Sequence, residues 1–321
     1  MALTSLWGLD PASYAPHALH GAERAWPETS CYVDVWIELC AARGVDPHAI
    51  LGFAIATDLE ADQWTFLRPP HGDLDELLGA RVHELNLWRP LAEHAVEQIA
   101  RGRILVVDMD SFWLPDTRGV SYQLTHGKTA IAIEAIDVDG ERLRYFHNAG
   151  YFELGGADFR GALRTEGTAP EVLSPYCELV DWSAPRTPTR DNAWRVLRRH
   201  AARRPTTNPV DALAARFAAR DGAWLREAGL PGLHAWSFGT LRMAGAAAEL
   251  VASHLRWLDG ARLEVAAAAF DEASMGCKAL QFKLARSLVS GRAVDAAGAF
   301  ASIAAAWQRG QDEVTRALEA G

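Results

Sequence analysis

Residues 26–44 read WPETSCYVDVWIELCAARG, and this pattern predicts a turn followed by one amphipathic helix. Ser30 is a good N-terminal cap, and Gly44 is typical of the residue at which a helix ends. Apolar side chains recur along 33–40 at the spacing of one buried helical stripe. The predicted helix therefore carries Cys31 in its first turn.

Cys31 has two interpretations. The N-terminus of a helix favours an anion, and a thiol placed there ionises more readily, which makes a cysteine nucleophile plausible at neutral pH. The alternative is a small buried apolar residue, which is the commoner use of cysteine. The position of Cys31 alone leaves both readings open.

Length and composition limit the class of protein. The 321 residues are 49% hydrophobic, enough for one large or two ordinary domains. The formal net charge of −9 argues against a nucleic-acid partner, which favours a basic surplus. Cys40, Cys177 and Cys277 are expected in the core, and without a CxxC pair they indicate neither a zinc site nor a disulfide framework. A signal peptide and a membrane-spanning apolar run are not evident, so a cytoplasmic protein without a membrane partner is expected.

Residues 1–185 mix strand and helix patterns. The turn DVDG at 137–140 joins two apolar β-rich runs into a hairpin, which favours an antiparallel sheet. The predicted class of this domain is α+β, with the Cys31 helix preceding the sheet. Strands are predicted at 50–57, 63–67, 80–87, 103–108, 129–137 and 143–147, and helices at 73–78 and 90–100.

Residues 186–321 contain helix patterns only. The segment SAPRTP at 183–188 is the best linker in the chain, so the predicted domains are 1–185 and 186–321. The second is predicted to be an all-α helical bundle. Its helices are expected at 191–204, 209–228, 234–258, 261–289 and 294–318, separated in part by Gly229, Gly260 and Gly291.

A cysteine nucleophile needs a base, and the base needs a group that orients it. His126 stands just before the strand 129–137, and Asn148 follows the next strand. Antiparallel pairing brings the start of one strand beside the end of the next, so Asn148 is predicted to hold the His126 ring. The order Cys31, His126, Asn148 is the papain-like order, and His147 is a reserve for the base.

Two segments resemble known sequences. ILVVDMDSFWLPDT…THGKTAIAIEAIDVDG…YFHNAGYF, within 104–152, resembles the N-terminal domain of the butirosin-biosynthesis acyltransferase family. ETSCYVDVW at 28–36 resembles the nucleophile segment of that family. More closely, the chain resembles a bacterial family catalogued only as a domain of unknown function and associated with amino acid:carrier-protein ligases.

The resemblance implies a papain-like cysteine peptidase or acyltransferase domain that takes an acyl or aminoacyl group from a phosphopantetheine thioester. Carried over by residue, Cys31 is the nucleophile, His126 the base and Asn148 the orienting group. The chain departs from the butirosin family at Ser30, where asparagine is common, and at Asn148, where the orienting residue is acidic.

Further residues are candidates for the same cleft. Gln63 is a candidate oxyanion donor, although a structural polar contact explains it equally well. Asp108 and Asp110 form the motif DMD, which could bind a metal; with no further carboxylate cluster, we expect them to line the cleft or cap a loop, and no metal site is predicted. The aromatic candidates for the cleft are Trp113, Tyr122 and Tyr151, although buried aromatics are the commoner case.

A run of arginines begins the helical domain, in an otherwise acidic chain. It is predicted either to dock an acidic carrier protein or to form an ordinary solvated helix face. The residues of this basic stripe are Arg195, Arg198, Arg199, Arg203 and Arg204.

The leading functional prediction is a carrier-protein-dependent aminoacyl or acyl transferase that works through an acyl-enzyme on Cys31. No cofactor is expected to bind directly, because the carrier protein supplies the phosphopantetheine arm; the acceptor is a small molecule or a peptide. One alternative is a cysteine peptidase, amidase or thioesterase of the same fold. Another is a non-catalytic protein that only binds the carrier protein.

Overall fold

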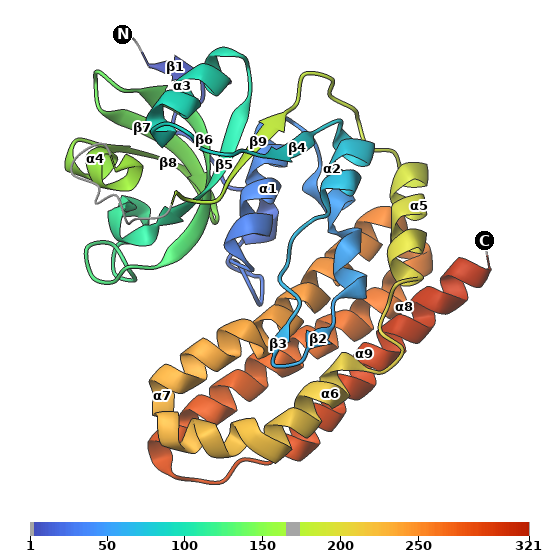
Figure 1. Cartoon of the computed structure of the whole chain (residues 1–321). Coiled ribbons are helices and arrows are strands. Elements are labelled where there is room, and N and C mark those ends of the chain that lie inside the picture. Colours follow the sequence, from blue (N-terminus) through green and yellow to red (C-terminus); the bar gives the residue numbers. More distant parts are fainter. Residues whose placement is uncertain (1–2, 165–173, 321) are drawn as a thin grey trace. The chain divides into compact units, whose positions relative to one another are not determined.

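The computed structural model describes residues 3–164 and 174–320 (Figure 1). The chain forms two compact units, each assembled from three separate segments. Unit 1 comprises Met1–Gly21, Cys31–Pro47 and Pro70–Thr187. Unit 2 comprises Ala22–Ser30, His48–Pro69 and Pro188–Gly321. Unit 1 is mixed α+β, and the part of unit 2 that follows Pro188 is helical, as the sequence predicts.

Unit 1 is built on a seven-stranded sheet with the order β4-β9-β5-β6-β7-β8, in which the short β1 also pairs with β6. All of these pairs are antiparallel, which confirms the predicted antiparallel sheet. The strands are β1 (Thr4–Ser5), β4 (Arg81–Glu84), β5 (Ile104–Asp110), β6 (Lys128–Asp137), β7 (Arg142–His147), β8 (Gly150–Gly155) and β9 (Cys177–Asp181).

The helix that carries Cys31 forms as predicted. Helix α1 spans Cys31–Ala42, and Gly44 follows it with φ +68°, a left-handed conformation that favours glycine. Every side chain from Tyr32 to Cys40 is buried, including Asp34 and Glu38. The helix is therefore enclosed on nearly all sides, whereas the sequence pattern indicates a single buried stripe.

The two faces of the sheet are covered by different helices. Val107 and Met109 of β5 belong to a core that includes side chains of α3 (Leu91–Ala100) and α4 (Ala157–Leu163). Helix α1 packs against β6 and β7. Because side chains alternate along a strand, Asp108 and Asp110 project to the face opposite α3 and α4. In β9, Glu178 lies between the core residues Cys177 and Leu179 and therefore also projects to this opposite face. Its contact with Tyr32 of α1 shows that α1 covers this face.

The short helical elements of unit 1 lie in its connections. Helix α2 spans His71–Leu78, close to its predicted bounds, and ends at Gly79 with φ +69°. The remaining short turns are the 3₁₀ helices η1 (Ala18–His20), η3 (Ser111–Trp113) and η4 (Pro115–Thr117).

The predicted strand at 50–57 is wrong. The segment belongs to a 3₁₀ helix, η2 (Pro47–Ala56), which lies in unit 2 from His48 onward. A short apolar run without a clear period fits a buried strand and a buried helix equally well. Here Gly52 packs so closely against His254 that an added Cβ would lie 2.9 Å from Nε2. The strand predicted at 63–67 is reduced to β3 (Gln63–Trp64), which pairs with β2 (Leu59–Glu60).

The helices of unit 2 follow the predicted pattern of glycine breaks. Gly229 has φ +63° inside α7, and Gly291 has φ +69° at the end of α8. The break expected at Gly260 falls one residue earlier, at Asp259 (φ −162°, ψ 81°). The elements are α5 (Arg190–Ala201), α6 (Pro209–Arg216), the π-helical turn η5 (Phe217–Asp221), α7 (Gly222–Gly239), α8 (Leu241–Ser290) and α9 (Ala296–Glu319). Among the described residues, no helix combines the length and apolar character needed to cross a membrane.

His254 is expected to make the free energy of unfolding depend on pH. Its buried ring donates through Nδ1 to the carbonyl of His48 at 2.7 Å, and burial lowers its pKa to about 4. In the unfolded chain a histidine titrates near pH 6.5, so the unfolded state gains its proton first as the pH falls. The full stabilisation is present above about pH 6.5, and about 3 kcal/mol is lost by about pH 4.

Urea unfolding of the wild type and of His254→Gln, followed from about pH 7 to pH 4, measures this contribution. The variant should be less stable at neutral pH and should lose less stability on acidification. Equal losses in the two proteins would contradict the assignment to His254.

Candidate functional site

His126 and Asp110 form a hydrogen-bonded pair where β5 ends and β6 begins. The register pairs Asp110 with Lys128, which places the residue two positions before Lys128 beside the Asp110 carboxylate. His126 Nδ1 lies 2.7 Å from Asp110 Oδ2, while Asp110 Oδ1 accepts backbone N–H groups of Phe112 and Gly127 at 3.1 and 3.2 Å. Partial burial raises the pKa of Asp110, but these hydrogen bonds outweigh it and hold the pKa below its usual value.

The carboxylate of Asp110 therefore contacts the His126 ring, which the sequence predicts to be held by Asn148. Asn148 lies between β7 and β8 in a left-handed conformation, φ +43°. Its role as the orienting amide stays a prediction. A carboxylate can do more than an amide in this position, because it orients the imidazole and also stabilises the imidazolium by charge.

The His126 ring is held on a second side by an aromatic ring. It stacks on Phe112, with 4.4 Å between ring centroids and 14° between ring planes. The side chain of His126 is nevertheless 71% exposed, so it can reach a ligand from solvent. Phe112 is a site residue that sequence reasoning missed, because nothing in its spacing marks it.

Two neighbouring cavities open beside this pair. A cavity of about 380 Å³ is lined by His126, Asp110, Lys128 and Tyr176, among others. A second, of about 310 Å³, shares Asp108, Met109 and Asp110 with the first and extends to apolar residues that include Trp88, Leu91 and Leu163. The Lys128 ammonium lies 3.1 Å from Asp108. The cavities therefore combine charged groups near His126 with an apolar lining near Trp88.

Cys31 is the most accessible of the four thiols. It is partly exposed at the first position of α1, whereas Cys40, Cys177 and Cys277 are buried. Burial raises the pKa of Cys177 and of Cys277 to about 12, and it also raises the pKa of Cys40. Among the described residues, no hydrogen bond joins the Cys31 sulfur to His126.

A buried carboxylate connects the start of α1 to the cavity beside His126. Tyr32, next to Cys31, donates to Glu178 Oε2 at 2.6 Å, and Tyr176 donates to Glu178 Oε1 at 2.7 Å. His71 Nε2 lies 3.1 Å from the same carboxylate. Because Tyr176 also lines the cavity of His126, these contacts place the Cys31 end of α1 at the same end of the sheet. Sequence reasoning missed Glu178, although an acidic residue between Cys177 and Leu179 was a usable signal.

His147, the reserve for the base, belongs to a separate buried network. Its Nδ1 contacts Asp116, and its Nε2 lies 2.8 Å from the Thr129 hydroxyl. Tyr145 donates to the other oxygen of Asp116. Both ring nitrogens of His147 are occupied within the protein, so we assign this network a structural role at the start of β6.

The other cleft candidates have contacts of their own. Tyr122 donates to Asp158 at 2.9 Å, and buried Tyr151 donates to Glu134. The Trp113 ring packs so closely on Gly161 that an added Cβ there would lie 2.2 Å from it. Gln63 is exposed in β3, which belongs to unit 2. Its role as an oxyanion donor stays a prediction.

The basic stripe begins in α5 and divides into exposed and anchored residues. Arg195, Arg198 and Arg203 are exposed, and the Arg198 guanidinium lies 5.6 Å from the Trp194 ring. Arg204 donates to Gln311 and Thr315 of α9 at 2.8 Å and so serves packing within unit 2. Arg199 is half-buried. Carrier-protein docking by this stripe stays a prediction.

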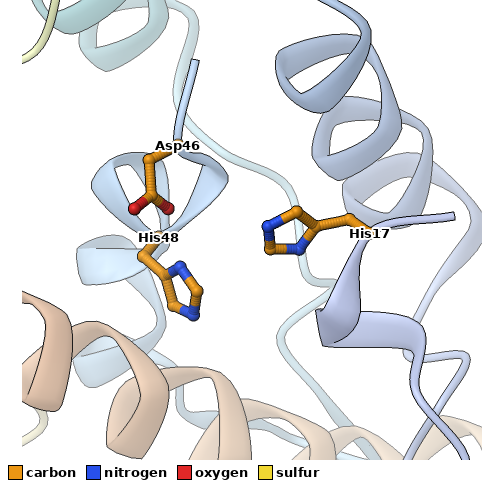
Figure 2. Close-up of side chains that lie close together, drawn as sticks. All are labelled: His17, Asp46 and His48. Carbon is orange, nitrogen blue, oxygen red and sulfur yellow. The ribbon is translucent and has the colours of Figure 1, made fainter. Parts of the chain in front are cut away.

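Figure 2 shows the side chains of His17, Asp46 and His48, of which the first two belong to unit 1 and the third to unit 2. His17 has a structural role within unit 1. Its Nδ1 accepts the N–H of Leu19 at 3.1 Å and caps η1, and its own N–H donates to Glu38 of α1 at 3.0 Å. These contacts tie the N-terminal segment to α1.

These features define a mixed α+β protein with an antiparallel sheet and a C-terminal helical region. The chain belongs to the DUF1839 family: the model of the DUF1839 N-terminal domain matches residues 15–182, and that of the DUF1839 C-terminal domain matches residues 186–316. No curated protein shows a significant match to the chain.

Proposed function

We propose that this protein is an acyl or aminoacyl transferase with a papain-like catalytic unit, acting on a thioester presented by a carrier protein. Cys31 is the nucleophile and His126 is the general base. Asp110 orients the His126 ring and stabilises its charged form. The acyl group arrives on the phosphopantetheine arm of the carrier protein and leaves on an amine or hydroxyl acceptor.

The observation that carries the proposal is the arrangement of α1 and the His126–Asp110 pair on one sheet. Asp110 projects to the face that α1 covers, and Tyr32 and Tyr176 join the Cys31 end of α1 to the cavity beside His126 through Glu178. A partly exposed thiol at a helix N-terminus and an exposed imidazole paired with a carboxylate are the parts that thiol acyl transfer needs.

The proposed reaction has two steps. The Cys31 sulfur attacks the thioester carbonyl, the bond from carbon to the pantetheine sulfur breaks, and His126 passes the thiol proton to the departing sulfur. The acceptor then attacks the acyl-Cys31 carbonyl, loses its proton to His126 and displaces the Cys31 sulfur, which recovers that proton. The backbone N–H groups at the start of α1 would stabilise the oxyanion in both steps.

Intact-protein mass spectrometry with an alanyl-loaded carrier protein tests the proposal. The wild type should gain the mass of one alanyl group, and Cys31→Ala should gain none. Cys277→Ala is the matched control, because it also removes one thiol but lies in unit 2, and it should still form the adduct.

The other outcomes identify the rival functions. Cys31-dependent loss of the thioester to water, with no transfer to any added amine or hydroxyl, would indicate a hydrolase of the same fold. Binding of the carrier protein without an adduct and without loss of the thioester would indicate a non-catalytic binding protein.

A further inference from the structure

The second half of α8 carries a line of exposed apolar side chains. Met275, Phe282 and Val289 are 58%, 60% and 73% exposed. They are spaced by seven residues, which is two helical turns, so they lie along one side of the helix. Ala279 is also exposed and falls between the first two. This spacing is the one by which a helix packs lengthwise against another helix.

The same segment is strongly basic. Residues 275–292 contain Lys278, Lys283, Arg286 and Arg292 and no acidic residue, in a chain with a net charge of −9. Lys283 and Arg286 are exposed on α8, and within the part of the chain that the structure describes neither takes part in an ion pair. They are therefore available to an outside acidic partner.

Around the beginning of this half of α8, in contrast, the charged side chains are paired within unit 2. Arg256 pairs with Glu264 and Asp271, and Glu272 pairs with Arg309 of α9. The charges around the start of this half are thus neutralised within unit 2, whereas those flanking the apolar line are not. The combination of an uncovered apolar line and unneutralised cations marks residues 275–289 as a surface for a partner.

We propose that this α8 face, defined by Met275, Ala279, Phe282, Lys283, Arg286 and Val289, binds an acidic amphipathic helix of a partner protein. The apolar side of that helix would cover the Met275–Val289 line, and its acidic flanks would pair with Lys283 and Arg286. A second copy of this chain is a poorer occupant, because a symmetric contact would bring the same cations together. The inference does not depend on the proposed acyl transfer.

Fluorescence anisotropy of a labelled synthetic helix tests the proposal on the full-length protein. The probe is a peptide of about 20 residues, with leucine at alternating three- and four-residue spacing and glutamate on both flanks. Binding should saturate and should weaken as salt is added, because salt screens exposed charges. Phe282→Ser should weaken binding at least about tenfold, as expected for a central aromatic contact.

Charge reversal and a matched control sharpen the test. The double variant Lys283→Glu, Arg286→Glu should lose the glutamate-flanked peptide and gain affinity for a peptide flanked by lysine. The double variant Arg220→Glu, Arg226→Glu reverses two exposed cations elsewhere in unit 2 and should bind like the wild type. Cys31→Ala should also bind like the wild type, whatever its transferase activity.

Two results would overturn the proposal. One is binding of the acidic peptide that neither Phe282→Ser nor the α8 charge reversal changes. The other is a dimer, seen by sedimentation velocity, that Phe282→Ser dissociates, since a second copy would then occupy the face. Circular dichroism verifies that the variants fold, which is expected because the substituted side chains are exposed.

Discussion

Replacing His126 by alanine is expected to slow acyl transfer from a loaded carrier protein by about 10²–10⁴-fold, the usual contribution of a positioned general base. The expectation rests on the pair that His126 makes with Asp110 at 2.7 Å and on the open cavity beside the ring. The protein should still fold, because the His126 side chain is 71% exposed. Single-turnover release of the free carrier thiol measures the rate.

Two further variants separate catalysis from structure. Asp110→Asn should slow transfer in the same direction, because an amide brings no charge to the imidazolium and can hold the ring in the wrong tautomer. His83→Ala removes another exposed histidine of the same sheet, in β4, and should leave the rate unchanged. A His126→Ala protein that transfers at the wild-type rate would remove His126 from the mechanism.

Replacing Asp116 by alanine is expected to destabilise unit 1 by about 2–6 kcal/mol, because it leaves two buried donors without an acceptor, each costing about 1–3 kcal/mol. Those donors are the Tyr145 hydroxyl and His147 Nδ1. The side chains of Asp116 and His147 are only 5% and 2% exposed. Burial, with Asp116 beside it, also raises the pKa of Tyr145, which keeps its hydroxyl protonated.

Urea unfolding at neutral pH measures this loss. Glu84→Ala, at the exposed end of β4, removes a carboxylate of the same unit and should change the free energy of unfolding by less than about 0.5 kcal/mol. If Asp116→Ala proved as mild as this control, the buried network would not support the sheet as described.

The candidate site was predictable in part from the sequence. His126 stands out because it directly precedes a strand, and Cys31 because it starts a helix with a clear cap and a clear end. The partner of His126 was not predictable, because it depends on the pairing of Asp110 with Lys128 between β5 and β6. The register of a sheet is set by contacts far apart in sequence, and DMD reads equally well as a metal motif or as the end of a strand.

The secondary structure was likewise predictable where nearby residues determine it, and not where residues far along the chain determine it. Helix α1 was predictable because its signals lie within twenty residues. The segment 50–57 was not predictable: it packs closely against His254, about two hundred residues later in the chain, and contacts at that separation leave no local signal. Strand β9 was missed for a related reason: its place between β4 and β5 is decided by partners from earlier parts of the chain.

The interleaving of the two units has a consequence for how the protein is made. Trp26 is buried in unit 2, where its backbone N–H donates to Glu249 and its indole N–H donates to Ser274, 248 residues further on. During translation, the segment Ala22–Ser30 is therefore synthesised long before α8, with which it packs in the folded protein. Contacts between such distant residues are slow to form, so we expect the nascent chain to expose this tryptophan for longer than a chain with two consecutive domains would.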